Sequence, residues 1–331
     1  MLTMSPSLLM FSSTLVAGTV ISISASSWFM AWLGLELNLL SFIPLIASKH
    51  NTFSSEAAFK YFLIQALGSA TLLASVTTML VFTSTPKILI FCSLMLKMAA
   101  APLHFWLPTI MQGMSWSNCI ILMTFQKIAP LVLTSYILCD QISLMLIAVS
   151  ILSALMGGLG GLNQTLLRKL MAFSSINHMA WMLAAMSSST NLWVHYIFTY
   201  TVISLSLVMP LSYNQIFHIK QLANFSSSQF NKMLVFLSLF SLGGLPPFLG
   251  FLPKMMVITS LINQQFFVWS VILTMTALIS LFYYVRLAIT SITLMSPKTS
   301  REMKFSEQGL TKISLINFLP MLFPLMTFIP I

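Results

Sequence analysis

The sequence has 331 residues, of which 58% are hydrophobic and 6% are charged. Soluble domains carry about 25% charged residues, so this composition excludes a water-soluble globular protein and places the chain in a lipid bilayer. The formal net charge is +10 at pH 7, and the three cysteines lack CxxC spacing, which argues against a metal site, an iron–sulfur cluster or a disulfide framework.

Apolar stretches of roughly 20 residues, the length that spans the hydrocarbon core as a helix, recur along the whole chain. The amino end, MLTMSPSLLM, has neither the basic region nor the cleavage site of a signal peptide, so we expect direct insertion or synthesis in place. We predict an all-α, multi-pass membrane protein with about eleven transmembrane helices, near residues 7–24, 28–47, 56–82, 86–108, 116–137, 141–162, 168–187, 191–213, 231–260, 264–292 and 312–330.

The basic residues between the predicted spans give the orientation, because Lys and Arg concentrate on the cytoplasm-like side. If the spans alternate, Lys87 faces one side and Arg286 lies close to the other. The amino terminus is therefore predicted inside and the carboxyl terminus outside. The residues on the inside are Lys49, Lys60, Arg168, Lys169, Lys220, Lys232, Lys298, Arg301, Lys304 and Lys312.

Several charged residues lie inside predicted spans. A charge at the bilayer centre costs about 2.5 to 3.5 kcal/mol on the most lenient scale, so each one needs a partner, water or a function. For Lys60 and Arg286, near span ends, ion pairing or snorkelling to the interface is sufficient. The four that need another explanation are Glu36, Lys97, Lys127 and Lys254.

Lys97 stands just before a predicted helix break in the segment LMLKMAAAPLHFWLP, residues 94–108. Pro102 has no N–H for the carbonyl of Met98 and clashes with it, so the helix should break just after Lys97. The freed carbonyl then faces the lysine, and the negative end of the half-helix favours an ammonium there. Exposed backbone at membrane depth is tolerated only inside protein or beside a wet cavity, so the pattern predicts water in mid-membrane.

A second segment, LFSLGGLPPFLGFLP at residues 239–253, matches the first with an offset of 145 residues. Both are the fourth span of a five-span block, and the helix breaks are predicted at Pro102, Pro246, Pro247 and Pro253. Because five is odd, the second block enters from the opposite face, which is an inverted repeat with discontinuous helices. We therefore predict one membrane domain over residues 1–331, with repeats at about 7–137 and 141–292 and an extra helix at about 312–330.

At these residues the chain resembles the antiporter-like membrane subunits of respiratory complex I. The resemblance covers nearly the whole chain and rests on LGLELNLLSFIPLI, EAAFKYFLIQALGSA, LKMAAAPLHFWLP, QKIAPL, GLNQTLLRKLMAFSSINHMAWML and GGLPPFLGFLPK. It implies a proton-translocating subunit, in which Glu36 is the intramembrane glutamate, Lys97 the broken-helix lysine, Lys127 the central lysine and Lys254 the exit-side lysine. The two larger antiporter-like subunits are considerably longer, so the chain is most similar to the smallest.

The same resemblance implies a subunit of the proton-translocating NADH:ubiquinone reductase in the mitochondrial inner membrane, with the amino terminus in the matrix and the carboxyl terminus in the intermembrane space. The expected partners are neighbouring antiporter-like and small membrane subunits and phospholipids including cardiolipin, and no nucleic acid. We expect no metal or cofactor on this chain and no redox centre of its own, because NADH, FMN, the iron–sulfur clusters and ubiquinone belong to other subunits.

Polar residues in the seventh span are further candidates. His178, beside Ser174 and Ser175 in FSSINHMAWML, could carry protons or order water between Lys127 and Lys254, although a hydrogen-bonded packing histidine explains it equally well. The glycines at 157–161 lack the setting of a dinucleotide loop and are better explained by close helix approach.

Two alternative functions stay open at this point. A free-standing cation/proton antiporter would need a cation site, for which three lysines and one glutamate are poor ligands. A scaffold that keeps these charges without transport is the other.

Overall fold

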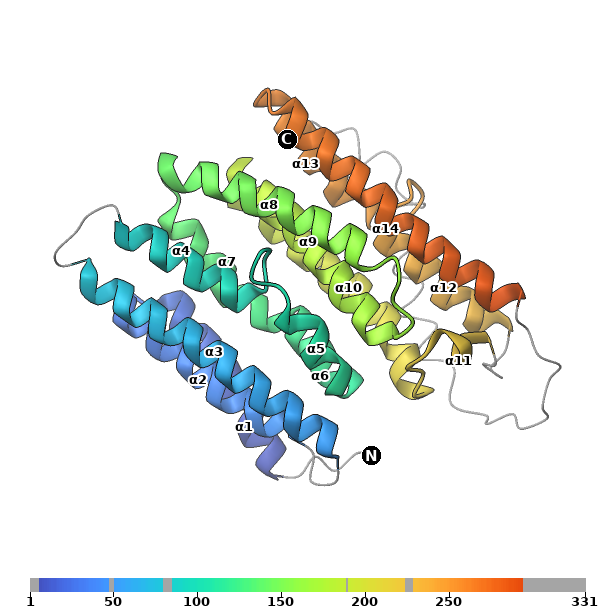
Figure 1. The fold of residues 1–331 in the computed structure, drawn as a ribbon, viewed down its shortest axis with the longest axis horizontal. Coiled ribbons are helices and arrows are strands. Elements are labelled where there is room, and N and C mark those ends of the chain that lie inside the picture. Colours follow the sequence, from blue (N-terminus) through green and yellow to red (C-terminus); the bar gives the residue numbers. More distant parts are fainter. Residues whose placement is uncertain (1–5, 48–50, 80–84, 189, 224–228, 294–331) are drawn as a thin grey trace. The chain divides into compact units, whose positions relative to one another are not determined.

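The computed structural model describes residues 6–47, 51–79, 85–188, 190–223 and 229–293 (Figure 1). Within these ranges the regular elements are all helices, and one isolated backbone bridge joins Leu166 and His218. The predicted all-α class is confirmed. The chain divides into two compact units, residues 1–149 and residues 150–331, with the boundary inside helix α8, Asp140–Gly160.

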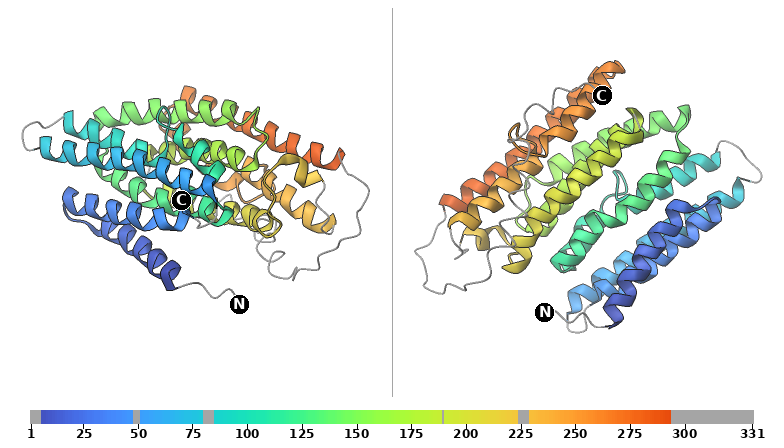
Figure 2. Two further views of the ribbon diagram at one scale, coloured as in Figure 1. Left: turned by 60° about the horizontal axis from the view of Figure 1, so that its bottom comes forward. Right: turned by 180° about the vertical axis from the view of Figure 1, so that it is seen from behind.

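The first unit begins with three long helices, α1 (Pro6–Ser24), α2 (Trp28–Ile46) and α3 (Thr52–Thr78), and α2 packs against both of the others (Figures 1 and 2). Two interrupted helices follow. The first consists of α4 (Thr85–Met98) and α5 (Trp106–Gly113), and the second of α6 (Trp116–Met123) and α7 (Phe125–Ile137). Helices α4 and α5 both contact α3, and α4 contacts α7, so the interruptions lie inside the unit.

The second unit contains α9 (Leu167–Ser188), α10 (Thr190–Tyr213) and the short α11 (Ile219–Ala223). An interrupted helix follows here too, made of α12 (Gln229–Gly243) and α13 (Phe251–Asn263), and α14 (Phe267–Thr293) is a continuous helix. Helix α9 contacts α10, α13 and α14 and is buried along most of its length.

Seven helical segments in the described residues are long and apolar enough to cross a membrane. They are Pro6–Ser24, Trp28–Ile46, Thr52–Thr78, Trp116–Ile137, Asp140–Gly160, Asn191–Tyr213 and Phe267–Thr290. The two halves that flank the α12–α13 interruption are shorter apolar helices, and α9 is too polar to qualify. The predicted span at 312–330 lies outside the described residues, so the predicted total of eleven stays a prediction.

Glycines allow close contact between helices at two places. A Cβ atom added to Gly34 on α2 would lie 2.5 Å from the backbone nitrogen of Ser22 on α1. A Cβ added to Gly157 on α8 would lie at the same distance from the backbone nitrogen of Asn177 on α9. The interpretation of the 157–161 glycines as packing residues is therefore confirmed at Gly157.

The two long interruptions have the same backbone turn. Helix α4 ends at Met98, followed by Ala99 with a φ of 58°, and α12 ends at Gly243, followed by Gly244 with a φ of 80°. In each turn, the second residue after the helix donates a backbone hydrogen bond to the last helical turn. In the first turn Ala100 N donates to Met95 O at 3.0 Å, and in the second Leu245 N donates to Phe240 O at 3.3 Å. This is the Schellman arrangement, which ends a helix at a left-handed residue. The second turn lies 145 residues after the first.

The prolines were predicted to break the helices, but the structure gives them other positions and roles. The helix ends just after Lys97, as expected, but the left-handed residue Ala99 ends it, before Pro102 is reached. Pro246 and Pro247 lie inside the second interruption. Pro253 lies in the first turn of α13, where a missing N–H has no intrahelical carbonyl to satisfy, so it starts this helix and does not break it.

Candidate functional site

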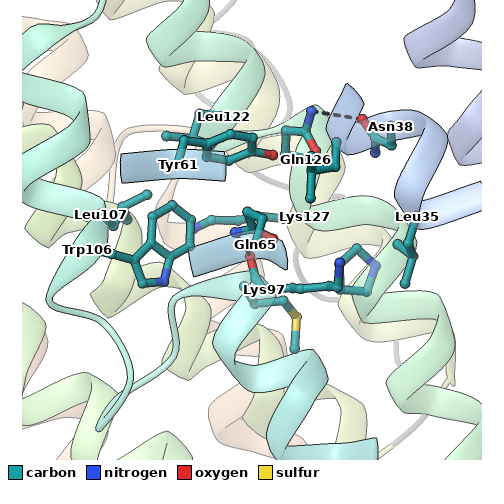
Figure 3. A pocket seen from close by; sticks show the side chains of 13 residues that line it. Leu35, Asn38, Tyr61, Gln65, Lys97, Trp106, Leu107, Leu122, Gln126 and Lys127 are labelled. Carbon is teal, nitrogen blue, oxygen red and sulfur yellow. Dashed lines mark hydrogen bonds between the residues drawn. The ribbon is translucent and has the colours of Figure 1, made fainter. Parts of the chain in front are cut away.

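A polar cavity lies inside the first unit, next to the interruption between α4 and α5 (Figure 3). The volume open to the centre of a water-sized sphere is about 20 Å³. A water molecule needs about 10 to 15 Å³ by this measure, so the cavity has room for one or two. Its walls are Leu35, Asn38, Leu39, Tyr61, Gln65, Lys97, Met98, Trp106, Leu107, Leu122, Gln126, Lys127 and Pro130.

Two of the four predicted charges, Lys97 and Lys127, line this cavity together. Lys97 is 7% exposed and lies in the last turn of α4, and Lys127 is 2% exposed and lies in the first turn of α7, directly after the interruption that follows α6. Gly68 on α3 makes room for the lysine stem, because a Cβ there would lie 3.3 Å from Lys97 Cγ. The interrupted helices thus bring two buried ammonium groups to one polar space.

The carbonyl groups at the end of α4 are bonded by neutral side chains. Trp106 Nε1 donates to Leu96 O at 3.0 Å, and Gln65 Nε2 donates to Lys97 O at 3.5 Å. The carbonyl that was expected to face Lys97 is that of Met98, and neither bond involves it, so this expectation stays a prediction. Sequence reasoning missed both donors, although a glutamine in the middle of an apolar span was a visible signal.

Glu36 lies on α2 beside the cavity-lining Leu35, close enough to Lys97 for electrostatic interaction. No ion pair joins Glu36 and Lys97 within the described ranges, and the buried oxygen Glu36 Oε2 has no hydrogen-bond partner there. On the same helix, Asn38 Oδ1 accepts a hydrogen bond from Gln126 Nε2 at 2.8 Å (Figure 3). In the part of the chain that the structure describes, the acid therefore interacts with Lys97 without being locked to it by a direct bond.

Lys254 lies in the first turn of α13 in the second unit and is 6% exposed. Its Nζ donates to Gly243 O at 2.8 Å and to Leu242 O at 3.3 Å, the carbonyls at the end of α12. Gly244 packs against the ammonium, since a Cβ there would lie 2.9 Å from Nζ. The expected pairing of a lysine with the carbonyls of a broken helix therefore occurs at Lys254.

His178, Ser174 and Ser175 are all buried on α9. The Nδ1 atom of His178 and the hydroxyl of Tyr196 are hydrogen-bonded at 2.9 Å, and the centroids of the His178 and Tyr200 rings are 4.8 Å apart. Both serine hydroxyls donate to carbonyls of their own helix, Met171 O and Ala172 O at 2.7 Å. The sequence had not pointed to the two tyrosines.

Two of the basic residues predicted on the inside, Lys60 and Arg168, have local contacts in the structure. Lys60 Nζ pairs with Glu56 Oε1 at 2.5 Å on the exposed start of α3, which agrees with the ion-pair interpretation. The Arg168 guanidinium lies 4.4 Å from the ring centroid of Phe217, next to the backbone bridge between Leu166 and His218. Lys49, Lys298, Arg301, Lys304 and Lys312 lie outside the described residues.

The family model described as "NADH:quinone oxidoreductase/Mrp antiporter, TM" matches residues 25–88 and 84–280, which is more than half of the chain. The chain belongs to this family. It is 46% identical to NADH-ubiquinone oxidoreductase chain 2 of Anopheles gambiae and 45% identical to that of Aedes aegypti, with 92% of each chain covered in both comparisons.

The fold is similar to that of chains in solved membrane complexes. A chain of respiratory complex I from Thermus thermophilus aligns with a TM-score of 0.83 at 22% identity, covering 97% of this chain and 79% of that one. A chain of the Mrp complex from Dietzia aligns with a TM-score of 0.79 at 18% identity, covering 91% of this chain and 63% of that one. At these identities the likeness concerns the fold alone.

Proposed function

We propose that the chain is the antiporter-like chain 2 subunit in the membrane arm of mitochondrial NADH:ubiquinone oxidoreductase and that it translocates protons across the inner membrane. The observation that carries the proposal is the cavity in the first unit, where Lys97 and Lys127 meet beside an interrupted helix. Two buried cations in a space large enough for water are expensive in a bilayer and are the groups that a proton path requires. The assignment to this complex is supported by the relatives named NADH-ubiquinone oxidoreductase chain 2.

The proposed path begins with Glu36, Lys97 and Lys127 of the first unit and continues with His178 and Lys254 of the second. Redox chemistry in other subunits drives it, and NADH, FMN, the iron–sulfur clusters and ubiquinone are bound there. The proposed inverted repeats, about 7–137 and 141–292, correspond approximately to the two units. We further propose that α4 with α5, α9, and α12 with α13 each complete a span, and that residues 312–330 form the last one. The amino terminus then lies in the matrix and the carboxyl terminus in the intermembrane space.

The test is to replace Lys97 or Lys127 by Met in the assembled complex and to measure protons moved per NADH oxidised in sealed vesicles. Either change should lower this ratio while the complex still assembles, because methionine keeps the length of the stem and removes the charge. The control is Lys60→Met, at an exposed lysine that pairs with Glu56. An unaltered ratio in both cavity variants would remove the proton path from this chain.

A free-standing cation/proton antiporter is the second candidate, and the fold likeness to the Mrp complex is the observation in its favour. The relatives at 45% and 46% identity favour the redox complex instead. Co-purification of the chain with redox subunits separates the two functions.

A further inference from the structure

The end of α4 is held by two side chains that the proton path does not use. Trp106 reaches back from the first turn of α5, and Gln65 reaches across from α3, to the carbonyls of Leu96 and Lys97. Both donors are buried and both line the cavity, where Figure 3 shows them beside Lys97. Neither carries a charge, so they satisfy the helix end without supplying a proton of their own at neutral pH.

The corresponding helix end in the second unit is satisfied differently. There, Lys254 Nζ itself donates to the carbonyls of Leu242 and Gly243. A lysine near a helix C-terminus readily bonds the last carbonyls, and the partial negative charge of that end attracts its ammonium. With the offset of 145 residues, the Leu242 carbonyl corresponds to that of Lys97, so at this position a lysine is the donor in the second unit and Gln65 is the donor in the first.

We propose that Gln65 and Trp106 are positioning residues for Lys97. By bonding the carbonyls at the end of α4, they keep its ammonium off its own helix end and leave it to the cavity that it shares with Lys127. This inference rests on the proposed function, because it assigns a role relative to the proton carried by Lys97. Within the described residues, Lys97 Nζ forms no hydrogen bond or ion pair, which agrees with an ammonium that faces the cavity space.

The packing around the two donors fixes their positions. The Trp106 ring meets the edge of Tyr61 with centroids 6.2 Å apart, and Tyr61 in turn meets Phe42 on α2 at 5.3 Å. Tyr61 and Gln65 lie four residues apart on α3 and therefore on one face of that helix. A single buried face of α3 thus supports the indole and supplies the amide.

The experiment uses the complex carrying Gln65→Leu together with Trp106→Phe, which removes both N–H donors and leaves apolar side chains in their place, with the smaller ring at residue 106 matched by the control below. We expect assembly to be retained and proton transfer through this chain to slow by about fivefold to tenfold, because the loss of a buried hydrogen bond changes an equilibrium by that order, so that protons moved per NADH oxidised fall by this chain's share. Trp106→Phe alone should show a smaller loss. The matched control is Trp193→Phe, since the buried Nε1 of Trp193 has no hydrogen-bond partner in the described residues.

The same changes are then made in the Lys97→Met background. If the two donors act through Lys97, they should add no further loss there, because coupled residues are not additive. A donor variant that assembles and pumps at the wild-type ratio overturns the inference, and so does a full additional loss in the Lys97→Met background. If Trp106→Phe fails to assemble while Trp193→Phe assembles, the bond from Trp106 serves stability alone, and the positioning role is also overturned. If Lys97→Met itself pumps normally, the proposed function of Lys97 fails first.

Discussion

Lys254 and Lys97 should respond differently to the same substitution. Lys254 Nζ is a hydrogen-bond donor to two carbonyls at the end of α12, whereas Lys97 Nζ bonds no group in the described residues. Replacing each lysine by Met removes a buried charge from a proposed proton path in both cases. Only Lys254→Met also removes the cap of a helix end, so it should lower stability as well as transport.

The size of this effect follows from the two bonds. A buried carbonyl left without a donor costs about 1 to 3 kcal/mol. The 2.8 Å bond to Gly243 O should account for most of the loss, because the 3.3 Å bond to Leu242 O is long. We therefore expect Lys254→Met to cost about 2 to 4 kcal/mol and Lys97→Met about 1 kcal/mol or less. Lys254→Gln keeps a donor and should recover part of the stability without recovering transport.

The assay compares the thermal midpoint and the steady-state amount of the assembled complex for the three variants, alongside proton translocation. The Lys254→Met variant should have the lowest thermal midpoint and the Lys254→Gln variant an intermediate one. The Lys97→Met variant should have a midpoint near that of the unaltered chain. Equal midpoints for the two Met variants, or a lower midpoint for Lys97→Met, would refute the assignment of Lys254 as a helix-end donor.

Three further changes test other parts of the structure. Gly244→Ala should destabilise the complex by about 1 kcal/mol or more, because it adds a Cβ at a positive φ and 2.9 Å from Lys254 Nζ. The control is Gly158→Ala, where the added Cβ meets ordinary contacts at 3.4 Å or more, so its thermal midpoint should be unchanged. If His178 relays protons, His178→Phe should lower pumping in sealed vesicles far more than Tyr196→Phe, which removes only one hydrogen bond worth about 1 kcal/mol; equal pumping in both would leave a packing histidine. An impermeant label on a cysteine placed at the exposed Lys220 should react only from the matrix face, and reaction from the opposite face would sink the proposed orientation.

The long helices could be predicted from the sequence because a continuous apolar run is enough to indicate each of them. Continuous apolar runs predicted α1, α2 and α8 to within one or two residues, since each fills the membrane thickness with few polar interruptions. The two interruptions at residues 99–105 and 244–250 were also visible, through their prolines. The residue that ends α4 was not, because Ala99 adopts a left-handed φ that alanine disfavours, and tertiary contacts must impose it.

The partners of the buried lysines were less accessible to sequence reasoning. Which donor reaches a helix end depends on side chains that come from other helices, such as Gln65 on α3, and no spacing rule connects residue 65 with residue 97. The offset of 145 residues predicted that the two breaks would match, and their turns do. It could not show that Lys254 would bond its helix end while Lys97 would not, because the two lysines stand on opposite sides of their breaks.

The position of Glu36 favours a switchable partner over a permanent ion pair. Its Oε2 is buried without a hydrogen-bond partner in the described residues, and it interacts with Lys97 electrostatically without a direct bond. Breaking a buried, bonded ion pair on one side costs about 3 to 5 kcal/mol, so a locked pair would make Glu36→Gln strongly destabilising. For the separated arrangement we expect Glu36→Gln to assemble with a nearly unchanged thermal midpoint and to lower proton translocation linked to quinone reduction, because the negative charge that interacts with Lys97 is gone. Normal pumping at the unaltered ratio and rate would make Glu36 a mere counter-charge, and a complex that fails to assemble would show that the pair is structural.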